Sequence, residues 1–242
     1  MRIDIFLADK GFVKSRTEAK ELLKNGAVSV GGQTVTKPAF RIDGLEEQVV
    51  VDRSLIKYVS RGGLKLDGAL CAFELDPRDK LCIDVGASSG GFTDCLLQHG
   101  AQHVIAVDSG SDQLEKTIRQ DKRVTVMEQF NARYMKTMHL PYRPNFAVMD
   151  VSFISATLIF ESLYNVLERG ADFVCLVKPQ FEVGRNALGK GGIVKDEKER
   201  NKALSNVVSF AKNIGFEALA AIVSPITGGD GNIEFLVHFK KV

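Results

Sequence analysis

The chain lacks the long apolar runs that membrane proteins need. Its longest unbroken apolar stretch is the six residues Ala218–Val223, whereas a membrane-spanning helix takes roughly 20. The first twelve residues, MRIDIFLADKGF, include Asp4 and Asp9 and have no extended apolar core, which is not the pattern of a secretory signal peptide. We therefore expect a cytoplasmic protein that does not enter a membrane.

Closely spaced cysteine pairs are also missing. None of Cys71, Cys82, Cys95 and Cys175 belongs to a C-x-x-C sequence, the usual sign of a zinc site or a redox motif. Cys82 and Cys175 lie in apolar, strand-like stretches, and the other two lie in helical ones. We therefore expect four buried free thiols, with no disulfide and no metal site.

The composition and the charge distribution indicate a soluble globular protein with a basic N-terminal part. The 242 residues are 45% hydrophobic and 26% charged, and the net charge is +2. This length suits one large domain, or a small domain followed by a medium one. Residues 1–60 contain ten basic and eight acidic side chains, and the remainder contains 22 of each. The excess positive charge therefore belongs to the first quarter of the chain.

The stretch 81–96, LCIDVGASSGGFTDCL, predicts a strand over 81–85, a glycine-rich turn and the start of a helix. This arrangement binds nucleotide-like ligands in α/β proteins. A Walker phosphate loop would need a lysine where Phe92 stands. The dinucleotide pattern G-x-G-x-x-G fails as well, because Ala-Ser-Ser follows Gly86.

The remaining pattern, D-V-G-x-x-x-G-G-F, resembles the first motif of methyltransferases that use S-adenosylmethionine (AdoMet), whose loop cradles the methionine part of the cofactor. The alternative is an ordinary tight turn between a strand and a helix. The resemblance implies cofactor contacts from Asp84, Gly86, Ala87, Ser88, Gly90, Gly91 and Phe92.

Strands and helices alternate after residue 60. Strands are expected at 81–85, 103–107, 124–127, 146–150 and 173–178, and two more at 217–223 and 233–239. This alternation predicts an α/β fold with a parallel sheet covered by helices on both faces. The final pair resembles the antiparallel hairpin that completes the seven-stranded, Rossmann-like sheet of an AdoMet-dependent methyltransferase.

Ligands of such sheets bind at the carboxyl ends of the strands. Asp108 follows the second strand and can accept both hydroxyls of a ribose, as the comparable acid of dinucleotide sites does. Asn131 follows the third strand and can pair with an adenine edge. With Asp150 after the fourth strand, these side chains complete the predicted cofactor site.

Residues 1–52 predict a small α+β module. Ser15-Arg-Thr-Glu18 is a capping box that opens a helix ending near Gly26. Arg16, Lys20 and Lys24 recur every four residues and form one basic stripe. The module resembles the S4 RNA-binding domain in R-x-D-x-x-L, S-R-x-x-A, G-x-V-x-V-x-G and V-x-K-P.

This resemblance implies RNA binding, whereas the alternative is a solvated helix face without a partner. The predicted RNA-binding residues are Arg2, Lys14, Arg16, Lys20, Lys24 and Arg61. A linker is expected at 53–60 and the catalytic domain at 61–242.

The sequence argues against two kinds of methyl transfer. Methylases of adenine amino groups tend to have D/N-P-P-Y/F after the fourth strand, where this chain has Asp150-Val-Ser-Phe153. Methylation of a base at C5 needs a cysteine nucleophile, and no cysteine follows the fourth or fifth strand; Cys175 lies in mid-strand.

Lys65, Asp150, Lys178 and Glu234 instead resemble the Lys-Asp-Lys-Glu tetrad of ribose 2′-O-methyltransferases of the FtsJ type. A ribose hydroxyl needs a base, and a lysine whose pKa is lowered by burial and a neighbouring cation can serve. We predict Lys178 as the base and Lys65 as the neighbouring cation. Asp150 and Glu234 would orient them, and no metal is needed. The alternative is that these are solvated surface charges.

The segments R-G-G-L-K-L, D-V-G-A-S-S-G-G-F-T-D, D-V-S-F-I-S, V-K-P-Q-F-E-x-G and G-x-G-N-x-E-F, together with the S4-like module, resemble the TlyA (hemolysin A-like) family along the whole chain. The resemblance implies AdoMet-dependent 2′-O-methylation of ribosomal RNA at cytidine. Three alternatives remain: a non-catalytic ribosome assembly factor with this fold, a methylase of RNA bases, and a hemolysin.

Overall fold

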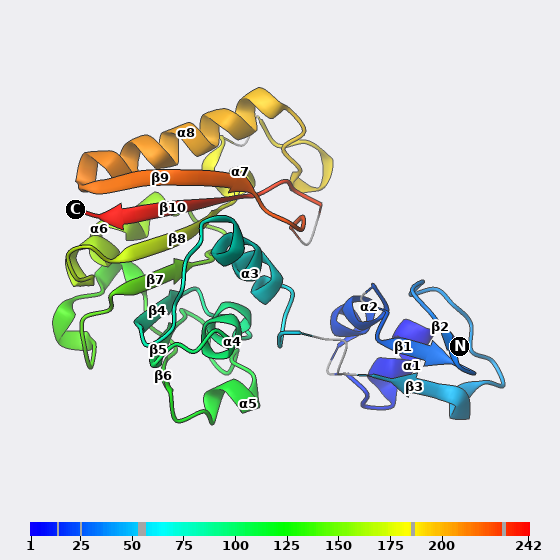
Figure 1. The fold of residues 1–242 in the computed structure, drawn as a ribbon. Coiled ribbons are helices and arrows are strands. Elements are labelled where there is room, and N and C mark those ends of the chain that lie inside the picture. The colour runs from blue at the N-terminus through cyan, green and yellow to red at the C-terminus, as the bar shows by residue number, and fades with distance from the viewer. Residues whose placement is uncertain (14, 25, 53–56, 185–186, 229–230) are drawn as a thin grey trace. The chain divides into compact units, whose positions relative to one another are not determined.

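The computed structural model describes residues 1–242 except 14, 25, 53–56, 185–186 and 229–230 (Figure 1). The chain forms two compact units, Met1–Lys57 and Tyr58–Val242. Lys14, one of the predicted RNA-binding residues, and four residues of the expected linker lie outside the described residues. Tyr58, which was also expected in the linker, is buried in the second unit.

The first unit combines two helices with a small antiparallel sheet of order β2-β1-β3. The helices are α1 (Ile3–Asp9) and α2 (Arg16–Lys24); the strands are β1 (Val28–Val30), β2 (Gln33–Thr34) and β3 (Val49–Val51), the last preceded by the short 3-10 helix η1 (Glu46–Gln48). The amide of Glu18 donates to Ser15 Oγ over 3.2 Å, so Ser15 caps α2 as the sequence predicts. Apolar side chains from both helices, from β1 and β3 and from the chain that connects these elements form one core.

The second unit is built on a seven-stranded sheet of order β6-β5-β4-β7-β8-β10-β9. The strands are β4 (Leu81–Val85), β5 (His103–Val107), β6 (Val124–Met127), β7 (Phe146–Met149), β8 (Asp172–Val177), β9 (Phe216–Val223) and β10 (Phe235–Lys241). The first five are parallel, and β10 runs antiparallel to both β8 and β9. The predicted parallel sheet with a terminal antiparallel hairpin is thus confirmed.

Helices cover both faces of this sheet (Figure 1). One face carries α3 (Gly62–Ala72), α4 (Gly91–Gln98) and α5 (Lys116–Arg119), and the other carries α6 (Thr157–Val166) and α8 (Glu197–Ile214). Shorter elements are η3 (Ala132–Tyr134), η4 (Thr137–His139), α7 (Pro179–Glu182) and η6 (Lys190–Gly192). Successive residues of a strand point to opposite faces. In β4, accordingly, Ile83 joins the core under α6 and α8, and Cys82 joins the core under α3 and α4.

The structure corrects three expectations. Glu234 directly precedes β10 and does not lie within it. Cys71 is exposed, whereas the other three cysteines are buried thiols as expected. The residue pattern of 113–119 predicts one helix, but the helix begins only at Lys116, because the amides just before it donate to a carboxylate described below. No helix among the described residues is both long and apolar enough to cross a membrane.

Candidate active site

A cavity of about 480 Å³ opens at the carboxyl ends of the central strands. It lies where the strand order reverses, since β4 is flanked by β5 on one side and by β7 on the other. Five of the ten predicted cofactor residues line it: Gly86, Ser88, Asp108, Asn131 and Asp150. Apolar side chains, including Val107, Phe130 and Ile159, form the rest of its wall.

Gly86 lets the backbone after β4 approach the backbone after β7. Its φ is +84°, and a Cβ built there would overlap the backbone carbonyl oxygen of Asp150. Any larger residue would push the two turns apart, so the position requires glycine. The glycine of the D-V-G pattern is therefore required for packing, and because it has no side chain it also leaves space in the cavity.

The other five predicted cofactor residues do not line the cavity. The side chains of Ala87 and Phe92 belong to the core beside α3 and α4. Gly90, with φ +94°, caps α4 and approaches Leu114. A Cβ on Gly91 would collide with Ser60 Oγ, so this glycine permits contact between α4 and the start of α3.

Asp84, the fifth, is a fully buried carboxyl below the glycine turn. Its Oδ2 accepts a hydrogen bond from Thr93 Oγ1 over 2.7 Å, and its Oδ1 has no hydrogen-bond partner among the described residues. Burial raises the pKa of Asp84 to about 7; the bond from Thr93 opposes this shift, and the charges of Asp150 and Asp108 add to it. Three carboxyl groups therefore interact electrostatically at one edge of the sheet.

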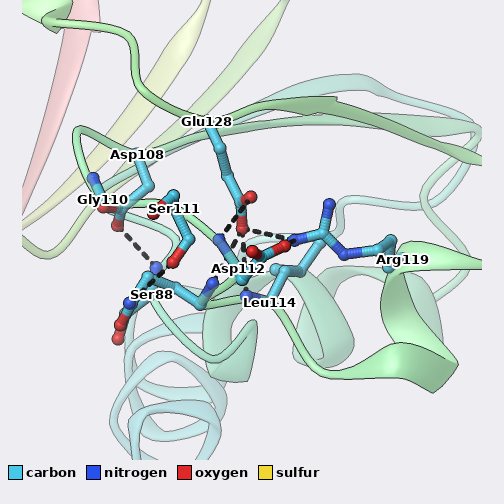
Figure 2. A network of polar contacts seen from close by, with 9 residues as sticks. Ser88, Asp108, Gly110, Ser111, Asp112, Leu114, Arg119 and Glu128 are labelled. Atoms are coloured by element: carbon cyan, nitrogen blue, oxygen red, sulfur yellow. Dashed lines mark hydrogen bonds and ion pairs between the residues drawn. The ribbon is translucent and has the colours of Figure 1, made fainter.

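Asp108 organises the loop after β5 (Figure 2). Its Oδ2 accepts from the amide of Ser88 over 2.8 Å, and its Oδ1 accepts from the amide of Gly110 over 2.7 Å. The carboxylate thus joins the glycine turn to the second strand while it lines the cavity. Each oxygen keeps capacity for a further hydrogen bond from a ligand hydroxyl.

Glu128, directly after β6, holds the next part of the same loop (Figure 2). Its carboxylate accepts from the amides of Asp112, Gln113 and Leu114 over 2.9–3.1 Å and pairs with Arg119 over 2.6 Å. The hydrogen bond from Arg119 is the main reason that the pKa of Glu128 falls to about 2, and the three amides contribute in the same direction against the effect of burial. The sequence analysis missed this residue, because no short motif marks it.

Asn131 lines the cavity, and its side chain also has a structural role. Its Oδ1 accepts from the amide of Arg133 over 3.1 Å and so caps η3. The amide nitrogen Nδ2 is the donor that this capping leaves for a ligand.

The two predicted lysines each form an ion pair with one of the predicted acids. Lys178 Nζ lies 2.5 Å from Asp150 Oδ1 and donates to Ser152 Oγ over 2.8 Å. Lys65 Nζ lies 2.6 Å from Glu234 Oε2. Lys65 and Glu234 are both buried. Removing one member of such a buried pair leaves an uncompensated charge, which is strongly unfavourable.

Gln180 connects the two pairs through the backbone. It follows Lys178 by two residues, and its Nε2 donates to Glu234 Oε1 over 3.3 Å. The structure therefore assembles the four predicted residues as two ion pairs from four separate segments. Gln180 lies within the V-K-P-Q segment, which by itself indicates no role for it, and no sequence pattern marks Ser152.

Two phenylalanines lie next to the Lys178–Asp150 pair in the sequence. Phe153 is 89% exposed and lines the cavity, and its ring centroid lies 5.3 Å from that of Phe181. The φ of Phe153 is +66°, an uncommon and strained value for a bulky residue. Such strain is typical of functional loops, where the surrounding structure maintains it.

The predicted RNA-binding residues of the first unit differ in their surroundings. Arg2 and Arg16 both bind the carboxylate of Asp4, over 2.9 Å in each case, and Asp4 is fully buried. Burial by itself would raise the pKa of Asp4, but the hydrogen bonds from the two arginines lower it overall. Lys20 and Lys24 are exposed on α2.

Arg61 has a structural contact in the second unit. Its guanidinium donates to the carbonyl oxygen of Thr227 over 3.0 Å and so links the start of α3 to the segment before β10. That contact leaves the predicted role in RNA binding a prediction.

Two family models match this chain, one for each of its two units. The model of the FtsJ-like methyltransferase family matches residues 58–241, and the S4 domain model matches residues 1–49. Hemolysin A of Brachyspira hyodysenteriae is 43% identical, with 99% of both chains covered. The 16S/23S rRNA (cytidine-2′-O)-methyltransferase TlyA of Mycobacterium tuberculosis is 40% identical, covering 99% of this chain and 89% of that protein.

Among solved structures, a "putative hemolysin" from Streptococcus thermophilus is 43% identical and superposes with a TM-score of 0.80, covering 100% of this chain and 88% of that one. Together with the family models, these full-length matches settle the affiliation. The chain belongs to the FtsJ-like methyltransferase family and carries an S4 domain at its N-terminus.

Proposed function

We propose that this protein transfers a methyl group from AdoMet to the 2′-hydroxyl of a cytidine ribose in ribosomal RNA. The observation that carries the proposal is the Lys178–Asp150 ion pair, whose Asp150 lines the cavity. The Lys65–Glu234 pair is connected to it through Gln180. The chemistry named for the 40% identical relative from Mycobacterium tuberculosis supports the same assignment.

The cavity suits AdoMet in size and charge. Its volume of about 480 Å³ lies in the usual range for cofactor sites. The carboxylates of Asp108 and Asp150 line the cavity and favour a cationic ligand. Asp108 would bind the ribose hydroxyls and Asn131 Nδ2 the adenine edge. When bound, AdoMet supplies the methyl group and takes the electron pair of the breaking carbon–sulfur bond.

Lys178 would accept the proton of the substrate hydroxyl. The ribose oxygen forms its new bond to carbon as its proton passes to the lysine amine, which must be neutral to accept it. Asp150 and Ser152 fix the position of Lys178 Nζ. The partner of Lys178 is thus the carboxylate of Asp150, whereas Lys65, the cation expected beside it, pairs with Glu234.

Lys65 and Glu234 would help to orient the segment that carries Lys178. Their ion pair is buried and is bound by Gln180, two residues from the base. This arrangement holds the end of β8 and the segment before β10 in a fixed relation, and alignment of the reacting atoms supplies much of an enzyme's rate.

RNA binding would involve both units. Exposed Lys20 and Lys24 suit phosphate contacts, which are largely independent of sequence. Phe153 and Phe181 offer an aromatic surface on which an unstacked base can lie. A base on Phe153 would bring its own ribose to the cavity that Phe153 lines.

The test incubates the protein with methyl-labelled AdoMet and ribosomal subunits from a strain that lacks the enzyme, and then digests the RNA to nucleosides. We expect label in 2′-O-methylcytidine. Lys178→Ala should abolish the label while AdoMet affinity, measured by calorimetry, stays within a few-fold. Lys122→Ala, at an exposed lysine of the same unit, is the matched control.

Label on a base would retain the methyltransferase but refute ribose as its target. AdoMet binding without any label would support the assembly-factor alternative, and lysis of red cells by the purified protein would support a hemolysin.

A further inference from the structure

Three potential metal ligands gather where the helices α3 and α4 of the second unit pack against each other. Asp67 of α3, Cys95 of α4 and His99 at the end of α4 place one ligand atom each within 4.8 Å of one another. None of the three lines the cavity described above. The cluster is therefore separate from the residues assigned to methyl transfer.

The helical geometry explains why these side chains meet. Cys95 and His99 are four residues apart, so they project from one face of α4. That face packs against α3, which supplies Asp67. Cys95 is fully buried, whereas the side chains of Asp67 and His99 are 27% and 36% exposed. An ion from solvent can thus reach a thiol at the floor of the cluster by passing two partly exposed ligands.

We propose that Asp67, Cys95 and His99 bind one divalent metal ion with zinc-like preferences. A thiolate, a neutral imidazole and a carboxylate are a donor set that Zn²⁺ accepts in tetrahedral sites. The thiolate and the carboxylate together carry two negative charges, which a divalent ion neutralises and a monovalent one does not. A water molecule would occupy the fourth position.

The distances require only small side-chain movements. His99 Nε2 lies 2.9 Å from Asp67 Oδ1. Bond lengths of about 2.0–2.3 Å in a tetrahedron separate the ligand atoms by roughly 3.4–3.7 Å. The oxygen and the nitrogen must therefore move apart slightly, and the sulfur, which already lies within 4.8 Å of both, needs at most a small approach.

Metal binding also has a defined proton balance. The thiol proton of Cys95 leaves to solvent, and the metal replaces the hydrogen bond between His99 and Asp67. Tyr58, whose hydroxyl donates to Asp67 Oδ1 over 2.9 Å, remains as an outer hydrogen-bond donor that orients the carboxylate.

The site would fasten two helices that serve the cavity. Lys65 of the tetrad lies two residues before Asp67 on α3, and α4 begins at the glycine turn. An ion bridging α3 and α4 would stabilise their contact without entering the reaction. The competing explanation is a metal-free hydrogen-bonded cluster, which the following experiment distinguishes.

The experiment uses the full-length protein, treated with chelator and titrated with Co²⁺ as a spectroscopic substitute for Zn²⁺. We expect one equivalent to bind with a thiolate-to-cobalt charge-transfer band, and one equivalent of Zn²⁺ to displace it. Zn²⁺ should also raise the midpoint of thermal unfolding, because it binds the folded state selectively.

Cys95→Ala should remove the charge-transfer band. Because that position is buried, His99→Gln serves as a second variant at a partly exposed ligand; it should weaken Co²⁺ binding by at least about tenfold, a typical cost even for outer residues of metal sites. Cys71→Ala and His139→Gln, at a thiol and an imidazole outside the cluster, should bind like the parent. Absence of the band in the parent, or its persistence at full affinity in His99→Gln, would overturn the proposal.

Discussion

Replacing Glu128 by Gln tests whether one carboxylate maintains the loop that borders the cavity. The glutamine has nearly the same shape, and its oxygen can replace Oε1, which accepts from Gln113, Leu114 and Arg119. Its NH₂ group would then face the amide of Asp112, a donor against a donor. The substitution also removes the negative charge opposite Arg119, so the loop loses a hydrogen bond and an ion pair together.

The lowered pKa sets the scale of the effect. A shift from 4.5 to about 2 corresponds to about 3 kcal/mol of preference for the ionised form in the folded protein. Because Arg119 is about one-third exposed, water screens part of its attraction, so we expect a loss of about 2 kcal/mol in the free energy of unfolding at pH 7. A group whose pKa is lowered on folding stabilises at pH above its unfolded value and loses this effect as pH falls. The parent should therefore lose this stabilisation between about pH 4.5 and pH 2, and the variant should not.

Urea unfolding of the second unit, followed by circular dichroism at several pH values, measures both effects. Glu168→Gln, at an exposed glutamate of the same unit, is the control and should change stability by less than about 0.5 kcal/mol. AdoMet affinity should also fall in Glu128→Gln, since Asp108 and Ser109 of the same loop line the cavity. If Glu128→Gln is as stable as the control at pH 7, the carboxylate does not hold the loop and our reasoning is wrong.

Three further predictions follow from the site. In the parent protein, the free energy of unfolding should fall by up to a few kcal/mol as pH rises from about 4 to 7, because a carboxyl with a pKa raised to about 7 favours the folded state only while it is protonated. Asp84→Asn should not show this fall. Urea titrations of both proteins at several pH values would measure it, and equal pH slopes would contradict the prediction. Changing both Lys20 and Lys24 to Ala should reduce the slope of log affinity for RNA against log salt by about 2, measured by filter binding, and an unchanged slope would exclude phosphate contacts there. Phe153→Ala should lower kcat/KM for RNA about tenfold or more, since stacking contributes about 1–3 kcal/mol per base, and Phe153→Tyr should restore it; equal kinetics of the two variants would exclude a stacking role.

Patterns that depend on neighbouring residues were predictable from the sequence. The apolar runs gave strands β5 and β6 with correct limits, and the D-V-G turn gave the position of the cavity. Lys65 and Glu234, which are 169 positions apart in the chain, could be associated only by resemblance to a known tetrad. Periodicity carries no information on which distant charges meet.

The missed contacts have a physical reason as well. Glu128 binds amides 14 to 16 residues away, and those bonds delay the start of α5 to Lys116, which helical periodicity alone cannot show. Asp84 and Phe92 belong to a cofactor motif, yet their side chains point into the interior. A motif identifies a turn reliably, but only the packing around it decides which members touch a ligand.

The pairing of Arg2 and Arg16 with buried Asp4 affects how RNA affinity should be interpreted. The two guanidinium groups share an internal counter-ion, so a phosphate that binds them competes with a carboxylate already in place. Arg16→Ala would weaken RNA binding and would also leave the buried Asp4 carboxylate with only one of its two arginine partners. The measured loss of RNA affinity would then combine a folding defect with a binding defect. Phosphate contacts of the S4 domain are therefore measured more cleanly at lysines on its surface than at the arginines that complete its core.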